Sequence, residues 1–147
     1  MRKRRRRKVE LPKVEKLKYA EREENLPTSI MGLPVRSKEE ARVGVALGFL
    51  GWYFRYQFRI FGGSDFRGGQ IIDYVVYTVP LPTPLYVQSQ YWHGPTMVRG
   101  SKDKLNQARV KRAMSGAWLD PREVWDYQLT SVEHAVNTLR DMFGRNL

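Results

Sequence analysis

The alternation of apolar and polar residues predicts three consecutive strands in the middle of the chain. Residues 53–61 (YFRYQFRIF) alternate aromatic and polar side chains, which is typical of a strand with one buried face. Residues 70–78 (QIIDYVVYT) and 85–92 (LYVQSQYW) are rich in β-branched and aromatic residues. Glycines separate the first two runs and prolines separate the last two, so each run is expected to form its own strand.

A helix is predicted immediately before these strands. Ser37 followed by Glu40 is a capping-box signature, in which a side chain accepts one of the free N–H groups of the first helical turn. Apolar residues then recur at helical spacing, at Val43, Ala46, Leu47 and Leu50.

The remaining third of the chain predicts two more helices with a strand between them. Residues 102–114 suit a basic amphipathic helix, 123–129 a short buried strand, and 131–143 a closing helix that Gly144 ends. The order helix, three strands, helix, strand, helix indicates an α/β fold with one mixed central sheet of about four strands flanked by helices.

Positive charge is concentrated in two segments of a chain whose formal net charge is +11. Residues 1–22 hold eleven Lys/Arg against three Glu, and residues 99–112 hold six Lys/Arg against one Asp. We expect a basic, largely extended N-terminal arm over 1–33, because such a run cannot bury surface, and a folded domain over 34–147.

Clustered basic residues favour a polyanionic partner, because each phosphate that they neutralise releases condensed counterions. The alternative is a solubilising tail or a nuclear-type address. A glycine loop at 62–69 could also approach a DNA backbone. The candidate nucleic-acid-binding residues are Arg4, Arg5, Arg6, Arg7, Ser64, Arg67, Lys102, Lys104, Arg109, Lys111 and Arg112.

Several classes of protein are disfavoured by the composition. The chain has no cysteine and two histidines, which excludes disulfides and gives little support to a zinc site. It has no phosphate-binding GxxxxGK[ST] loop, no signal peptide and no apolar run of about 18 residues. We therefore expect a cytoplasmic protein that uses neither a nucleotide cofactor nor a membrane.

Asp73 is the strongest candidate for chemistry, because it interrupts an apolar strand. An unpaired carboxylate is costly to bury among isoleucine and valine. A strand end that faces Mg²⁺ would explain it, since this cation prefers oxygen ligands that include one or two carboxylates. The alternative is an Asp on the solvent face of the strand that pairs with a basic neighbour.

Other polar residues could complete such a site. Gln88 and Gln90 point to one face of their strand, where their amide oxygens could ligate a cation or orient water, or could simply be exposed. Glu40 could reach the same site from the first helix, or serve only in its capping box. His93 could carry a proton or contact a phosphate, or it could be packed with its aromatic neighbours.

These segments, in this order, resemble the PD-(D/E)XK nuclease superfamily from about Ser37 to the C-terminus. The opening helix with Glu40 resembles that of the family, and residues 68–76 (GGQIIDYVV) resemble its metal-binding Asp strand. Residues 85–93 (LYVQSQYWH) and 123–126 (EVWD) are similar to strands of very-short-patch-repair endonucleases.

The resemblance implies a restriction-endonuclease-like core and a role for each matching residue. Asp73 would bind Mg²⁺ or Mn²⁺, Gln88 would replace the second acidic ligand, and the Ser89 carbonyl would complete the coordination. Glu40 would hold metal-bound water or a second metal. Gln90 stands where the family usually has lysine, so water activation would fall to the metal, to His93 or to a lysine from elsewhere.

Among these nucleases, the chain resembles the archaeal-type Holliday junction resolvases, which phages also encode. The mismatch-repair relatives carry a structural zinc with cysteine ligands, which this chain lacks. We therefore expect a homodimer that cuts branched or duplex DNA by paired nicks, in the nucleoid or in the cytoplasm of a phage-infected host. The alternatives are a nicking endonuclease similar to the very-short-patch-repair enzymes and a non-catalytic DNA- or RNA-binding protein with a decayed site.

Overall fold

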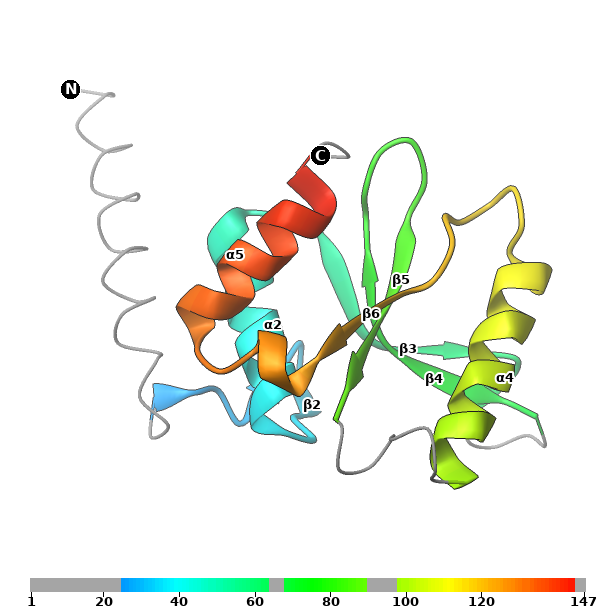
Figure 1. Ribbon diagram of the computed structural model, residues 1–147, viewed down its shortest axis with the longest axis horizontal. Coiled ribbons are helices and arrows are strands. Elements are labelled where there is room, and N and C mark those ends of the chain that lie inside the picture. Colours follow the sequence, from blue (N-terminus) through cyan, green and yellow to red (C-terminus); the bar gives the residue numbers. More distant parts are fainter. Residues whose placement is uncertain (1–24, 64–67, 90–97, 145–147) are drawn as a thin grey trace.

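A computed structural model describes residues 25–63, 68–89 and 98–144, with side chains in the last range from residue 104 onward. A four-stranded sheet stands between helices (Figure 1). Helices α2 (Lys38–Leu50) and α5 (Val132–Phe143) pack on one face, and α4 (Val98–Ala113) packs on the other. The α/β class and the mixed sheet predicted from the sequence are confirmed.

The sheet has the order β3-β4-β5-β6. Its strands are β3 (Phe54–Ile60), β4 (Gln70–Val76), β5 (Thr83–Gln88) and β6 (Arg122–Trp125). The first three are antiparallel neighbours, whereas β5 and β6 are parallel. Parallel neighbours need a long crossover connection, and α4 lies in that connection.

Strands β4 and β5 separate partway along their length. Their register covers three residue pairs, from Val76↔Thr83 to Tyr74↔Leu85. Beyond that point β4 remains paired with β3, as in Phe58↔Ile72, and β5 remains paired with β6, as in Gln88↔Trp125. Asp73 is therefore the first residue of β4 past the last β4–β5 pair.

The helices on the first face begin where the sequence predicts. The Ser37 and Ser131 hydroxyls accept the N–H groups of Glu40 at 3.1 Å and of His134 at 3.0 Å. Together α2 and α5 cover the larger core, whose fully buried members include Leu47, Tyr74, Leu85, Val124, Leu129, Leu139 and Phe143.

The opposite face carries a smaller core beneath α4. Ile72, Val75 and Tyr86 of the sheet pack with Val110 of the helix. Trp118, in the connection to β6, meets Phe58 edge to face, with ring centroids 5.3 Å apart. Both faces of the sheet are thus covered, which fits a sheet that contains a parallel pair.

The strand predicted over 123–129 is too long. β6 ends at Trp125, and a 3-10 turn, η3 (Asp126–Gln128), follows. Local hydrogen bonds end the strand: the Gln128 amide oxygen accepts from Trp125 N at 3.0 Å, and the Asp126 carboxylate accepts from Tyr127 N at 2.8 Å. Such side chains compete with a sheet ladder for the main chain.

A small hairpin precedes α2, within the segment that the sequence assigns to the arm. It pairs β1 (Ser29–Ile30) with β2 (Leu33–Pro34). Ile30 reaches the larger core, where it packs close to Gly44 of α2. Ordered structure therefore begins before Pro34.

Gly44→Ala should destabilise the fold, because α2 lies too close to its neighbours there to accept a methyl group. An added Cβ would meet the Ile30 side chain and would lie 2.9 Å from the Tyr74 hydroxyl. We expect the free energy of unfolding to fall by about 1–3 kcal/mol in chemical denaturation.

Gly48→Ala on the same helix is the matched control. Nothing lies within 4 Å of a Cβ at that position. This change should raise the free energy of unfolding by up to about 1 kcal/mol, because alanine favours helix. Equal effects of the two substitutions would contradict the close approach at Gly44.

Candidate functional site

The Asp73 carboxylate lies where β4 and β5 separate. The side chain is half-buried, and its Oδ2 accepts the main-chain N–H of Val87 at 2.8 Å. A continued ladder would have offered a β4 carbonyl to that N–H group, and the carboxylate takes its place. A hydrogen bond to an ionised acceptor is stronger than a neutral one, so it fixes Asp73 against β5.

The end of β5 is also held from the β6 side. Gln88 follows Val87, is buried, and pairs in register with Trp125 of β6. The Ser89 hydroxyl donates to Asp126 Oδ2 at 3.3 Å. The structure thus brings Asp73 next to the stretch that contains Gln88 and Ser89. The other two candidates from this motif, Gln90 and His93, lie outside the described residues.

Glu40 is buried between α2 and the sheet. Its Oε1 accepts the Tyr56 hydroxyl at 2.6 Å, and its main-chain carbonyl accepts the Tyr74 hydroxyl at 2.6 Å. Burial raises the pKa of Glu40, while the Tyr56 bond and the charge of Arg36 act in the opposite direction. Glu40 therefore connects α2 to both β3 and β4.

The charges of both Glu40 and Asp73 affect the pKa of the Tyr74 hydroxyl. Burial raises the pKa of Tyr74 far above its usual value, and the nearby Tyr56, Glu40 and Asp73 raise it further. Burial and the bond to Glu40 also raise the pKa of Tyr56 to about 12. Both tyrosines consequently remain protonated donors at neutral pH, and both carboxylates lie close enough to act on one hydroxyl.

Among the residues that the structure describes, no three or more His, Cys, Asp or Glu side chains form a group that could hold a metal. A cation at this point would draw on one carboxylate together with neutral amide or main-chain oxygens. Mg²⁺ accepts such a set, because it keeps several of its own waters.

The predicted DNA-contacting residues on α4 fall into two groups. Lys104, Lys111 and Arg112 are exposed, and Lys111 Nζ lies 3.4 Å from an Asp120 carboxylate oxygen. Arg109 is exposed as well, but it contacts the neighbouring loop: it donates to the Gly68 carbonyl at 2.6 Å and lies over the Phe61 ring at 4.7 Å.

The remaining candidates for DNA contact lie outside the residues and side chains that the structure describes. These are the arginines of the N-terminal segment, the two loop residues, and the side chain of the first lysine of the basic segment: Arg4, Arg5, Arg6, Arg7, Ser64, Arg67 and Lys102.

Two residues at this end of the sheet received no role from the sequence. Asp126 was noted within the EVWD motif, yet its bond to Ser89 depends on the parallel pairing of β5 and β6, which no local pattern reveals. Tyr127 lies exposed beside it. An acidic residue inside the strand predicted over 123–129 was the available signal.

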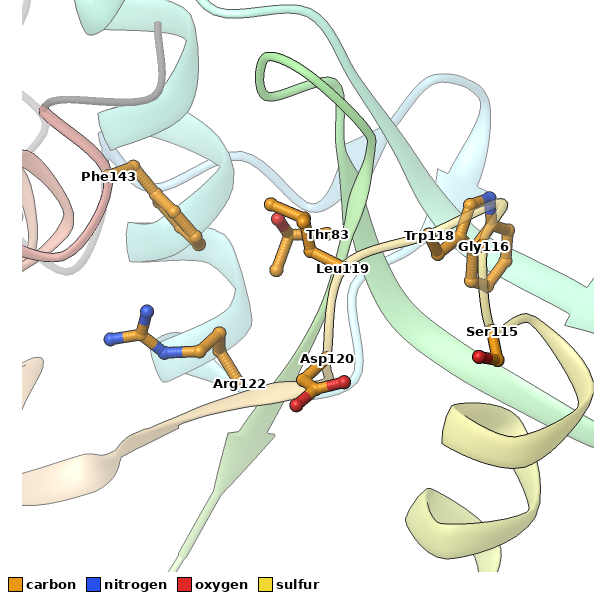
Figure 2. A pocket seen from close by; sticks show the side chains of 8 residues that line it. All are labelled: Thr83, Ser115, Gly116, Trp118, Leu119, Asp120, Arg122 and Phe143. Atoms are coloured by element: carbon orange, nitrogen blue, oxygen red, sulfur yellow. The ribbon is translucent and has the colours of Figure 1, made fainter.

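A pocket lies at the other end of the parallel strand pair, where β5 and β6 begin. Thr83 at the start of β5 and Arg122 at the start of β6 line it, together with Phe143 of α5 and the connection after α4 (Figure 2). Gln88 and Trp125 end the same two strands, so this pocket is remote from the separation of β4 and β5.

Comparisons with protein-family models, with curated proteins and with solved structures find no match for this chain. In the described ranges, no helix combines the length and the apolar character that a bilayer crossing needs.

Burial of Glu40 should make the protein less stable as the pH rises. Because its pKa is raised from 4.5 in the folded state, the folded chain binds more protons than the unfolded chain above that pH. The stability contribution therefore falls from about pH 4.5 upward through the folded pKa and then levels off. Glu40→Gln should remove this falling component from the free energy of unfolding, measured with a chelator present.

Glu133→Gln is the control, because it removes an exposed carboxylate and leaves Glu40 in place. The falling component should persist in this variant. An unchanged pH profile in Glu40→Gln would show that Glu40 does not titrate as its burial requires.

Proposed function

We propose that this chain is a metal-dependent, structure-selective DNA endonuclease with a PD-(D/E)XK-like core. The observation that carries the proposal is the position of Asp73, whose carboxylate binds the Val87 N–H one residue before Gln88. The mixed sheet with helices on both faces supports it as well. An isolated surface Asp would have given no such support.

Hydrolysis of a phosphodiester needs an activated water and compensation for the charge that develops on the phosphate. Bound Mg²⁺ or Mn²⁺ supplies both. Asp73 would be the anionic ligand, oriented by Val87 N–H, with the Gln88 amide and the Ser89 carbonyl as neutral ligands. Glu40, which accepts the Tyr56 hydroxyl, lies on the α2 face of the sheet, so it would order water there rather than bind the same cation as Asp73.

The neutral Gln88 leaves one alternative open to experiment. If Asp73 is the one acidic ligand, as among the residues that the structure describes at the end of β5 on its β4 side, the site would bind a cation less strongly than one with two acidic ligands. A protein that binds DNA without cutting it would tolerate that loss. The two functions differ in whether purified protein cleaves DNA when Mg²⁺ or Mn²⁺ is added.

Branched DNA is the substrate that we propose. A Holliday junction resolvase recognises structure through phosphate contacts rather than through base sequence. The exposed cations on α4 suit such contacts. A homodimer would place two copies of Asp73 on opposed strands, in the nucleoid or in the cytoplasm of a phage-infected host.

Asp73→Asn should abolish cleavage and retain binding. Asparagine keeps an oxygen that can accept the Val87 N–H, so the strand geometry should survive, whereas the anionic ligand is lost. Metal ions contribute several kcal/mol to such reactions, so we expect cutting of a labelled four-way junction to slow by at least about a thousandfold.

Asp141→Asn is the matched control, because it removes an exposed carboxylate from α5. It should cut at the parental rate. If the parent cuts no junction or duplex with either metal ion, the enzymatic proposal fails and the binding alternative stands. Cutting that survives in Asp73→Asn would disprove the role of this residue.

The double variant Lys104→Ala, Arg112→Ala should weaken the salt dependence of junction binding. If each exposed side chain neutralises one phosphate, the slope of log affinity against log salt should decrease by about two. Arg55→Ala with Arg140→Ala removes the same charge from exposed positions on β3 and α5 and should leave the slope unchanged. Equal slopes in all three proteins would exclude α4 from the DNA interface.

A further inference from the structure

We propose that the segment from the end of β6 through η3 binds an unstacked nucleobase of the DNA substrate. The site consists of the Trp125 and Tyr127 rings and the pocket beside them. This inference rests on the proposed function, because it names the part of the DNA that such an endonuclease would hold next to its cutting site.

The two aromatic rings form a prepared surface. Their planes are within 13° of parallel and their centroids are 6.5 Å apart, so a planar base that lies parallel to one ring is nearly parallel to both. Tyr127 is 55% exposed although it is a large aromatic residue. The turn itself is fixed, because Gln128 and Asp126 side chains bind the N–H groups of Trp125 and Tyr127.

The adjoining pocket can bind the edge of a base. Tyr127 lines it together with Glu39, Arg42, Asp126 and Thr130. The Glu39 carboxylate can accept from the amino or imino groups of a base, as acidic side chains do with cytosine. Arg42 is held by a bond from Nη1 to the Leu129 carbonyl at 2.9 Å, and its buried Nε has no acceptor in the described part of the chain.

The charge of this pocket selects a base over a phosphate. Glu39 and Asp126 outnumber Arg42, the one cation of the lining, whose Nη1 already donates to the Leu129 carbonyl, so a phosphate placed here would meet more negative than positive charge. A nucleobase is neutral, and its edge carries donors that carboxylates accept. The α4 surface has the opposite character and suits the sugar-phosphate backbone.

The position of the site connects base binding to strand cutting. Trp125 is the register partner of Gln88, and Asp126 binds the Ser89 hydroxyl. A base on Tyr127 would therefore lie beside the end of β5 that Asp73 contacts. Removing a base from an intact duplex costs unstacking energy, whereas an unpaired base at a branch point costs less to bind. A base site at Tyr127 would therefore favour branched DNA over an intact duplex.

The test uses 2-aminopurine, whose fluorescence is quenched when it stacks on another ring. It replaces one unpaired base at the centre of a branched DNA, and binding is measured with a chelator on Asp73→Asn protein, so that no strand is cut. We expect quenching on binding. Adding Tyr127→Ala should remove the quenching and weaken binding of the branched DNA by about 5- to 150-fold, the range measured for base–aromatic stacking.

Two further variants distinguish stacking from a general loss of structure. Tyr127→Phe keeps the ring and should keep both quenching and affinity. Tyr53→Ala removes another exposed tyrosine, next to β3 at the far edge of the sheet, and should behave as the parent. Affinity for an intact duplex should be the same in all of these proteins.

Unchanged quenching in Tyr127→Ala, or an equal loss of duplex affinity, would overturn the inference. Failure of the proposed function looks different: it is an absence of metal-dependent cutting by the parent, or cutting that persists in Asp73→Asn. Because base binding is measured without cleavage, the two results are independent.

Discussion

The hydrogen bond from Val87 N–H to the Asp73 carboxylate is the contact on which the site depends. It joins β4 to β5 at the point where their main-chain pairing has ended. Without it, a part-buried donor on β5 would lose its acceptor, at a cost of about 1 kcal/mol. The same bond fixes the orientation of the carboxylate, so one contact serves both the sheet and the proposed chemistry.

The next residue along β4 secures the other face of the sheet. Tyr74 donates to the Glu40 carbonyl, and Tyr56 donates to the Glu40 carboxylate, so two hydroxyls tie α2 to β3 and β4. Gly44 allows this helix to lie close to Tyr74. Adjacent strand residues point to opposite faces. Asp73 and Tyr74 thus anchor β4 in two directions, which gives the carboxylate a rigid support.

Local patterns in the sequence predicted the helices and strands but not the pairing and contacts between them. Ser37 was a recognisable helix cap, because the capping bond involves only residues three apart, whereas the start of the last helix was predicted without naming Ser131 as its cap. The end of β6 was missed, although the side chains that end it, Asp126 and Gln128, were visible. The separation of β4 from β5 arises from pairing between distant segments, so the sequence could single out Asp73 as costly to bury but could not supply its partner.

In the proposed DNA complex, the two faces of the sheet would hold different groups of the DNA. α4 packs on one face and exposes Lys104 and Arg112, which attract phosphates. On the α2 side, Glu39 and Tyr127 line a pocket that disfavours phosphates and suits a neutral ring. In Figure 1 the end of β5 lies between α4 and the segment that follows β6. A DNA strand whose backbone follows α4 and whose base turns toward Tyr127 would have to cross that end of β5. In the proposed complex the DNA strand would bend and unstack beside Asp73, which a branch point permits and a regular duplex resists.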